Sequence, residues 1–580
     1  MDRAGLLRWL LIGAAIFLFL QVGWPWLTGK NGGDVRQPLT GLRDDVAAEK
    51  QAEEKTCDLA GPRFRAQLTT KGAALKHAWM EDGKYQQDGK PIDLVTTWRP
   101  ARLPLRTDLR DLAGTATQVD HNDLDWKLSE QTGTSCSFVY EDAKAKLQKT
   151  ISTTDRPFEL AVAMSVTNKA DKPQKHRLTI EHTDWRTQKE TSGSWGRVSE
   201  HMTTADIRSA GDVHRYDPSD FESDEFDDEE FTDEKWRRAS GTATWSAVSS
   251  SYFAKSVIHV EGPDAPHREA LIEEVWKQQQ FPKKSDDPEY GHVYRSRLNY
   301  GIRELATNAT ADYKMLAYVG PKEREVLAAV GGGPYDTTDL LDLGMFGWIG
   351  KFLIRYLYLL RDFVGSWGIA ICLLTITVKL LLFPLSISQI KSAMAMRKLK
   401  PQMDELNEKF KDDATQRGLA LQELWRKNNV TNPMLGCLPV LLQMPVWFAL
   451  YTALQTAVEL YHTPFLWFPD LSAPDRFYTI PLVLGASSFL QQMLMPMQGD
   501  PLQQKMMKYM MPAMFTVFML FLPAGLGIYF LTNTWLGILQ QLAVERYYKS
   551  QQATEAPEGK ALDADKARKG KTKKAEPKTA

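Results

Sequence analysis

Six long apolar stretches, nearly free of charged residues, alternate with polar regions along this chain. The first runs from Trp9 to Leu27 and is interrupted only by Gln21. As a helix, its 19 residues cover about 28 Å, which matches the hydrocarbon core of a bilayer. The pattern therefore predicts a polytopic α-helical membrane protein with six transmembrane helices. The first lies within residues 1–28, and the other five lie at 366–385, 433–458, 477–495, 507–522 and 525–544.

Basic residues indicate the side of the membrane on which each loop lies. The loop 386–432 holds nine Lys or Arg residues and the chain after residue 544 holds ten, whereas the loop 459–476 holds only Arg476. Because cytoplasmic loops carry the excess of Lys and Arg, we expect both termini in the cytoplasm and residues 28–343 on the outer side. A cleaved signal peptide would have a shorter apolar core and a small-residue cleavage site, so we interpret 1–28 as a signal-anchor.

The outer region divides into a linker and a folded domain. Residues 29–56 are rich in Gly, Asp, Glu, Lys and Gln, which is typical of a flexible linker. Residues 57–343 contain short alternating runs bounded by Gly, Pro and Asp, which predict a large antiparallel β-sandwich. Cys57 and Cys136 could form a disulfide if this region is exported. The clearest alternating runs are Phe64–Leu68, Phe158–Val166, Arg177–Glu181 and Tyr313–Val319.

Two segments of this outer region stand apart from the strand pattern. Residues 217–234 contain eleven Asp or Glu among eighteen residues, which favours a solvated disordered loop, with an acidic docking surface as the alternative. The run Gly331–Pro334 has the composition of a hinge, and we expect it to lead into the membrane part.

The loop 386–432 predicts a helical hairpin on the cytoplasmic side. Asp413 and Gln416 resemble a capping box that opens a second helix, which would continue through Trp425. The tail 549–580 is rich in Lys, Ala, Asp and Glu, so we expect a basic disordered segment attracted to anionic lipid or ribosomal RNA. Apolar residues with 3-4-3-4 spacing form the seam of the first hairpin helix: Met396, Leu399, Met403, Leu406 and Phe410.

Lys379 lies inside the second predicted span. A charged residue in hydrocarbon costs about 3 kcal/mol on insertion scales and therefore tends to mark a functional site. The alternative is that its apolar stem lets the ammonium reach the cytoplasmic interface, which begins about 9 Å away. The other spans contain further polar side chains, and we expect a water-filled cavity around Lys379. These polar residues are Thr375, Gln443, Thr516, Thr532 and Asn533.

Two further patterns each allow two interpretations. Eleven of the 20 methionines fall between Met434 and Met519, which is consistent with ordinary gap-filling or with an adaptable apolar binding surface. Residues 351–364 place Lys351, Arg355 and Asp362 near one face. This segment is either an amphipathic helix on the outer interface or an extension of the second span.

The chain contains no HExxH, GxSxG, Walker A or GxGxxG motif, and its ten His residues form no metal-ligand pattern. We therefore expect no enzyme activity, no catalytic residues, no metal and no cofactor. Two classes of function that need no enzyme chemistry remain as alternatives. A secondary transporter should show an internal repeat and paired broken helices, which the sequence lacks. A membrane-anchored periplasmic carbohydrate-binding protein would not need the five later spans.

The run from Asn432 to Tyr451 (NPMLGCLPVLLQMPVWFALY) closely resembles the signature of the YidC/Oxa/Alb membrane protein insertase family. Within the outer region, Ser251–Phe253 and Tyr318–Lys322 resemble the periplasmic domain of the family members in Gram-negative bacteria. Four shorter motifs support the resemblance, in order along the chain: Gly365–Gly368, Phe383–Leu385, Asp500–Lys505 and Pro523–Leu526.

This resemblance implies an insertase core at 344–548, in which five helices enclose a hydrophilic groove open to the cytoplasm and to lipid. It also implies a periplasmic β-super-sandwich similar to sugar mutarotases, without their chemistry. The family's groove cation is usually arginine and falls on Lys379, which keeps the charge but loses the planar donor fork. Thr375 and Phe530 match groove positions, beside Gln443 and Asn533. The apolar slide for a substrate helix falls on Trp447, Leu484 and Phe518.

The resemblance further implies a membrane protein insertase and chaperone in the inner membrane of a Gram-negative bacterium. Its expected partners are nascent membrane proteins and the phospholipid bilayer. The Sec translocon (SecYEG and SecDF) is a further expected partner, and the ribosome is another, through the C-terminal tail.

Overall fold

The computed structural model describes most of residues 53–572. The gaps are 88, 98–101, 112–125, 192–198, 200, 210, 222–236, 240–242, 262–266, 277–289, 345, 412, 429–437 and 495–504. The predicted signal-anchor, nearly all of the linker and most of the acidic segment therefore lie outside the described residues. The described chain forms two units, which we call the β unit (53–343 and 454–463) and the helical unit (344–453 and 464–572).

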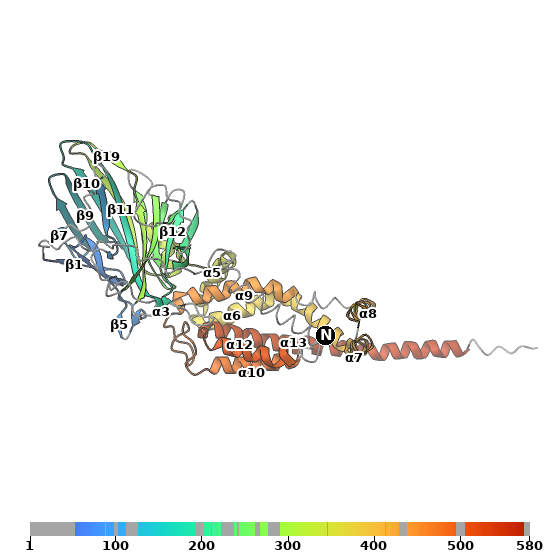
Figure 1. Cartoon of the computed structure of the whole chain (residues 1–580). Helices are drawn as coiled ribbons and strands as arrows, with labels where there is room; N and C mark the ends of the chain where they lie inside the picture. Colours follow the sequence, from blue (N-terminus) through green and yellow to red (C-terminus); the bar gives the residue numbers. More distant parts are fainter. Residues whose placement is uncertain are drawn as a thin grey trace, which may run out of the picture. The chain divides into compact units, whose positions relative to one another are not determined.

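Two large antiparallel sheets make up most of the β unit (Figure 1). They pack against each other, and the hydroxyls of Ser246 and Ser296 join them by a hydrogen bond of 2.5 Å. The nine-stranded sheet has the order β13 (Asp212–Tyr216), β12 (Thr204–Ser209), β15 (Ala243–Ser249), β16 (Phe253–Glu261), β20 (Thr310–Pro321), β10 (Glu159–Asn168), β9 (Ala145–Thr153), β8 (Ser135–Glu141) and β7 (Lys127–Gln131). The six-stranded sheet has the order β14 (Arg237–Ala239), β17 (His267–Trp276), β18 (Tyr290–Asn299), β11 (Gln174–Thr187) and β19 (Arg303–Leu305), and β6 (Thr107–Asp111) also pairs with β11.

Alternation of side chains explains why these segments form strands. In β20, Ala311, Tyr313 and Met315 are buried, while Asp312 and Lys314 between them are exposed. Successive side chains of a strand point to opposite faces, so this pattern places one face of the sheet in the core. The predicted sandwich is thus present, and its four clearest predicted runs fall in β2 (Phe64–Thr69), β10, β11 and β20.

A disulfide between Cys57 and Cys136 joins a smaller sheet to the nine-stranded one. The smaller sheet has three strands, β1 (Thr56–Gly61), β2 and β3 (Ala74–Met80), and Cys57 lies in β1. Cys136 lies in β8, with 6.3 Å between the two Cα atoms. Neither cysteine side chain is exposed. The pair closes a loop of 79 residues, so it restricts the unfolded chain strongly.

Replacing Cys57 by Ser should lower the free energy of unfolding of the β unit by about 2–5 kcal/mol. Stability is lost for two reasons. The unfolded chain gains conformational entropy without the disulfide, and the serine hydroxyl is buried in an apolar site. Thermal unfolding of the full-length protein in detergent, followed by circular dichroism in the β region, measures it. The Cys57→Ser/Cys136→Ser double variant, which buries a second hydroxyl, should be at least as destabilised as the single variant. An unchanged melting temperature in both variants would contradict a stabilising role of the Cys57–Cys136 disulfide.

The predicted glycine hinge is wrong, because Gly331–Gly333 are held within the β unit. All three glycines have positive φ angles, of 59°, 87° and 96°, which side chains disfavour. The Gly331 N–H donates to Glu159 Oε2 at 2.7 Å, and a Cβ at Gly331 would lie 2.3 Å from the Tyr335 ring. The glycines therefore permit a tight turn rather than a flexible joint. They follow α4 (Arg324–Ala329) and precede a short 3₁₀ turn, Thr337–Leu340.

Residues 454–463 fold as part of the β unit, although they lie between two helices of the helical unit. Glu459 is buried there, and one of its carboxylate oxygens accepts a hydrogen bond of 3.1 Å from the Arg324 N–H. Lys84 donates to the Glu459 carbonyl at 3.1 Å. The Tyr461 ring lies 5.3 Å from that of Tyr252. Burial raises the pKa of Glu459 to about 7, although the Arg324 N–H and Lys84 oppose this rise.

Glu459 should make the β unit less stable as the pH rises. Its folded pKa of about 7 exceeds the ordinary value of 4.5. The protonated form is therefore favoured on folding, and this contribution, on the order of 3 kcal/mol, is lost as the pH rises from 4.5 to 7. Glu459→Gln, which stays neutral, should remove that part of the pH dependence. Melting temperatures at pH 5 and pH 8 measure it, and an equal decrease in the two proteins would contradict the assignment.

The helical unit contains the later helices of the chain (Figure 1). Helix α13 packs against α6 and α10, α12 packs against α10, and α5 packs against α6. Among the described residues, no helix combines the length and the apolar character needed to cross a bilayer. The helices are α5 (Gly347–Val364), α6 (Trp367–Leu381), α7 (Phe383–Lys409), α8 (Ala414–Lys427), α9 (Leu438–Thr456), α10 (Thr479–Leu494), the π-helical turn η9 (Met506–Met510), α12 (Met511–Met519) and α13 (Ala524–Thr572).

The structure corrects two expectations about where helices end. Helix α5 is separate from α6, because Gly365 ends it in the left-handed conformation with φ of 70°; the extension of the second span is therefore wrong. Lys351, Arg355 and Asp362 are all exposed on α5. The disordered tail is also wrong up to Thr572, since α13 continues that far. The Ala, Lys, Glu and Gln residues of the tail are good helix formers, which explains the extension.

Candidate functional site

Three helices of the helical unit meet at a glycine of α13. A Cβ built on Gly537 would lie 2.8 Å from Gln491 Nε2 of α10 and 3.8 Å from Lys379 Nζ of α6. The missing side chain therefore leaves room for an amide and an ammonium to approach the same backbone. Lys379 is half-buried, and no described residue forms an ion pair or hydrogen bond with it. An unpaired cation in such a place can attract a carboxylate that enters from outside the chain.

The other polar residues predicted for the cavity differ in burial and in hydrogen bonding. Thr375, one turn earlier in α6, is 1% exposed and donates to the Ile371 carbonyl at 2.7 Å, so its hydroxyl is already used. Asn533 of α13 is half-buried. Gln443 lies in α9, and its side chain lies outside the described residues. The structure brings Lys379 together with Gln491, a residue that the sequence pattern does not connect with it. A glutamine within an apolar helix was the signal that could have identified it.

An aromatic cluster links three helices of the unit. Phe530 of α13 is 6% exposed, and its ring centroid lies 6.1 Å from Trp447 of α9 and 5.1 Å from Phe515 of α12. The Trp447 indole N–H is buried and has no hydrogen-bond partner among the described residues. The cluster is thus apolar except for one free donor, which water or a substrate backbone could satisfy.

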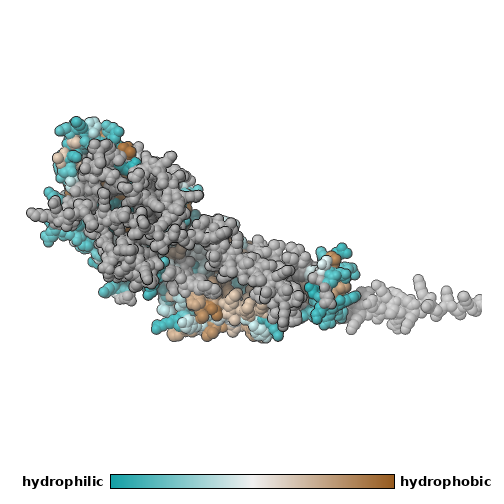
Figure 2. All heavy atoms as spheres, in the orientation of Figure 1, coloured by the Kyte–Doolittle hydropathy of each residue, from teal (hydrophilic) through white to brown (hydrophobic). Residues whose placement is uncertain are grey.

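The three predicted slide residues differ in accessibility. Leu484 of α10 is fully buried, because α10 and α12 approach closely there: a Cβ at neighbouring Gly485 would lie 2.2 Å from the Thr516 hydroxyl. Trp447 and Phe518 are half-buried. Leu484 therefore cannot touch a substrate in this arrangement. The exposed apolar side chains lie on other faces of α10, η9 and α12, where Figure 2 shows a hydrophobic surface. They include Leu482, Val483, Leu490 and Met493 of α10, Met507 and Met510 of η9, and Met511, Met514 and Val517 of α12.

Helices α7 and α8 pack through an apolar contact. Met396 and Leu399 of α7 are buried, and Met403 of the same helix and Trp425 of α8 pack against them. The remaining seam residues, Leu406 and Phe410, are half-buried. Asp413 caps α8, since its carboxylate accepts hydrogen bonds of 2.9 Å from the Thr415 and Gln416 N–H groups.

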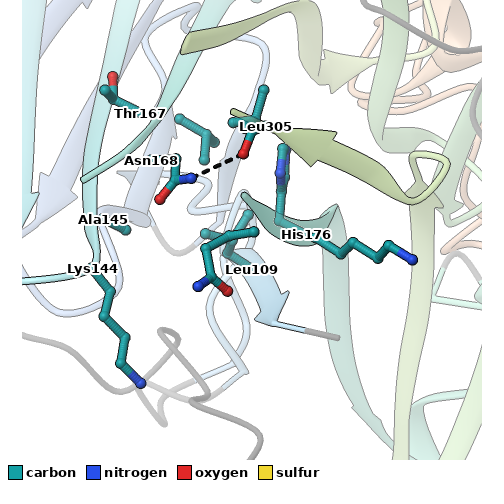
Figure 3. Close-up of a pocket in the computed structure, with 10 residues that line it drawn as sticks. Leu109, Lys144, Ala145, Thr167, Asn168, His176 and Leu305 are labelled. Carbon is teal, nitrogen blue, oxygen red and sulfur yellow. Dashed lines mark hydrogen bonds between the residues drawn. The ribbon is translucent and has the colours of Figure 1, made fainter. Parts of the chain in front are cut away.

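The β unit contains a small open pocket beside the last residues of β10 and β19 (Figure 3). Leu109 and Leu305 are among its lining residues, and the Asn168 amide donates to the Leu305 carbonyl at 2.9 Å. His176 lines the pocket and is hydrogen-bonded to the Tyr313 hydroxyl at 2.8 Å. The space, about 50 Å³, would hold a few water molecules rather than a sugar ring. Within the described residues, no group of His, Cys, Asp and Glu side chains is arranged to hold a metal ion.

Two family descriptions match this chain. The YidC periplasmic domain matches residues 57–356, and the 60Kd inner membrane protein family matches residues 359–552. The membrane protein insertase YidC of Anaeromyxobacter dehalogenans (strain 2CP-C) is 33% identical over 523 residues, which are 86% of each chain. That of Shewanella sp. (strain ANA-3) is 44% identical over 251 residues, which are 42% of this chain and 45% of the relative.

A solved structure described as an active YidC insertase, with its first transmembrane domain resolved, is 21% identical to this chain. The match covers 86% of this chain and 93% of the solved one, with a TM-score of 0.35. A galactose mutarotase related enzyme from Lactobacillus acidophilus is 11% identical and matches 46% of this chain and 97% of its own, with a TM-score of 0.30.

Proposed function

The chain belongs to the YidC family of membrane protein insertases, and we propose that it inserts integral membrane proteins through a groove beside Lys379. The observation that carries this proposal is the meeting of Lys379, Gln491 and the space over Gly537 on three packed helices. Lys379 has no partner among the described residues and is available to a substrate. No nucleotide and no covalent chemistry are needed for the step.

The proposed mechanism lowers the barrier for a polar tail. In hydrocarbon, a polypeptide segment that is not hydrogen-bonded costs several kcal/mol for each backbone group. A water-filled groove that reaches partway across the membrane shortens the apolar distance, and Lys379 attracts acidic residues of the tail. The apolar segment of the substrate meanwhile contacts exposed side chains such as Met514 and Val517 and then enters the lipid. Flexible thioethers suit this contact, because they adapt to apolar partners of different shape.

The proposed topology has six transmembrane helices in the inner membrane and both termini in the cytoplasm. The Lys and Arg bias of the loops supports it: nine basic residues at 386–432 against one at 459–476. The β unit then lies in the periplasm, and the α7–α8 hairpin lies in the cytoplasm and receives the nascent chain. The basic C-terminal segment docks on the ribosome, and the Sec translocon acts beside the protein on larger substrates.

Site-specific photo-crosslinking tests the groove. A photoreactive benzoylphenylalanine at Asn533 should crosslink to a stalled, single-span nascent chain, whereas one at exposed Thr310 of β20 should not. A second probe at Val517 should crosslink to the apolar part of the same substrate. If Asn533 gives no adduct while Val517 does, the substrate uses the lipid-facing surface alone. The groove would then be excluded as its route.

A further inference from the structure

The loop 464–478 of the helical unit holds two bulky residues in a conformation that they disfavour. Leu466 has a φ of 52° and Tyr478 has a φ of 56°. Left-handed backbone suits glycine, and a branched or aromatic residue there is strained unless its side chain serves a purpose. Both side chains point outward, since Leu466 is 73% exposed and Tyr478 is 54% exposed. Packing inside the protein therefore does not explain why leucine and tyrosine occupy positions whose backbone conformation favours glycine.

The loop is otherwise firmly fixed. Phe465 and Phe468 exchange two backbone hydrogen bonds of 2.9 Å, and Phe468 is buried. The Asp475 carboxylate accepts from the Phe477 N–H at 3.0 Å and from the Ile480 N–H at 2.7 Å, which ties the loop to the start of α10.

Backbone hydrogen bonds also tie the loop to the first residues of α13. The Ala524 N–H donates to the Ala473 carbonyl and the Gly525 N–H donates to the Leu471 carbonyl, each at 2.8 Å. The strained positions thus belong to a rigid frame that holds their side chains in place.

Two further large side chains extend the same exposed set. Trp467 is 48% exposed and Phe477 is 66% exposed, and each neighbours one of the strained residues in sequence. This set continues along α10, where Leu482 is 64% exposed one turn after Tyr478. Arg476, the residue before Phe477, is also exposed and provides a cation.

We propose that the loop 464–478 is a rigid anchor that inserts Leu466, Trp467, Phe477 and Tyr478 into the headgroup–acyl boundary of a phospholipid bilayer. Tryptophan and tyrosine favour this boundary, because their rings are apolar while an N–H or O–H stays hydrated. Arg476 can meet lipid phosphates from the same loop. The continuity with the apolar side of α10 favours lipid over a protein partner. Strain is retained at Leu466 and Tyr478 because glycine there would supply no anchor. The inference rests on the proposed function, in which the helical unit crosses the membrane.

Spin labelling of the full-length protein in phosphatidylethanolamine–phosphatidylglycerol liposomes tests the anchor. Cys372 and Cys437 are replaced by alanine, and a single nitroxide is placed at Leu466→Cys or Tyr478→Cys. Collisions with oxygen report lipid, and collisions with a water-soluble nickel chelate report solvent. The lipid control is Leu490→Cys on the exposed side of α10, and the solvent control is Gln87→Cys in the β unit. We expect the labels at 466 and 478 to lose nickel accessibility and to resemble the label at 490.

The other possible outcomes contradict either the membrane anchor or the membrane crossing of the helical unit. Labels at 466 and 478 that behave like Gln87, while 490 is in lipid, would overturn the anchor and leave the proposed function intact. A label at 490 that is open to nickel would overturn the membrane crossing itself. Labels at 466 and 478 shielded from both reagents would mean that protein covers the loop, which also overturns the anchor.

A glycine substitution separates the lipid role from a structural one. Leu466→Gly relieves the strained φ and removes an exposed side chain, so the melting temperature of the protein in detergent should not fall. A clear fall in the melting temperature would mean that Leu466 stabilises the fold, and this would contradict the proposal.

Discussion

Replacing Lys379 by alanine should reduce the insertion of substrates with acidic translocated tails about tenfold. A factor of ten corresponds to about 1.4 kcal/mol, which is at the lower end of what a charge-assisted contact contributes. Because no described side chain pairs with Lys379, its loss leaves no unpaired carboxylate behind and the fold should persist. Initial rates of tail translocation in proteoliposomes, at equal amounts of reconstituted protein, measure the effect.

Two controls separate charge from structure. Lys379→Arg keeps the cation and restores the donor fork usual in the family, so it should insert acidic tails at least as well as the native chain. A substrate whose tail is neutral should be little affected by Lys379→Ala. Equal rates for acidic tails in the native and alanine proteins would remove Lys379 from the mechanism.

Filling the space over Gly537 should reduce insertion as strongly as Lys379→Ala does. A leucine at this position would extend past its Cβ, which already lies 2.8 Å from Gln491 Nε2 and 3.8 Å from Lys379 Nζ. The larger side chain would displace the amide and cover the ammonium, so we expect insertion of acidic tails to fall about tenfold. The same proteoliposome assay measures it.

Gly537→Ala provides the matched control. Its single methyl group comes too close only to the end of a flexible glutamine, which can shift, and its contact with Lys379 Nζ at 3.8 Å is an ordinary van der Waals distance. Alanine also favours the helical backbone over glycine, so α13 should gain a little stability. Normal insertion by the leucine variant would show that the space between α6, α10 and α13 is not part of the substrate route.

The fold of the β unit could be predicted from the sequence because strand alternation is a local signal. The pattern that marked Tyr313–Val319 reappears in β20, where alternate residues are buried. Cys57 and Cys136 could be named only as a potential pair, since their bond depends on how β1 is placed beside β8. The glycines at 331–333 do not identify a hinge, because composition alone does not separate a flexible joint from a tight turn fixed by a carboxylate.

The candidate site was only partly predictable, because it depends on which helix faces meet. Lys379 could be identified from the energetic cost of a charge in an apolar helix. Gln491 could not be connected with it, since the two residues are more than a hundred positions apart and meet only through the missing side chain of Gly537. Leu484 matched a family position, but close packing of α10 on α12 buries it. The strained conformations of Leu466 and Tyr478 have no signature in the sequence at all.

Reconstitution of the purified protein alone into liposomes tests whether this chain inserts membrane proteins on its own. A small single-span substrate with a short acidic tail is translated in their presence, and external protease is then added. We expect the tail to be protected in these liposomes and digested in empty ones, and we expect Lys379→Ala to weaken the protection. Digestion of the tail in both, with the protein correctly oriented, would contradict insertion by this chain on its own.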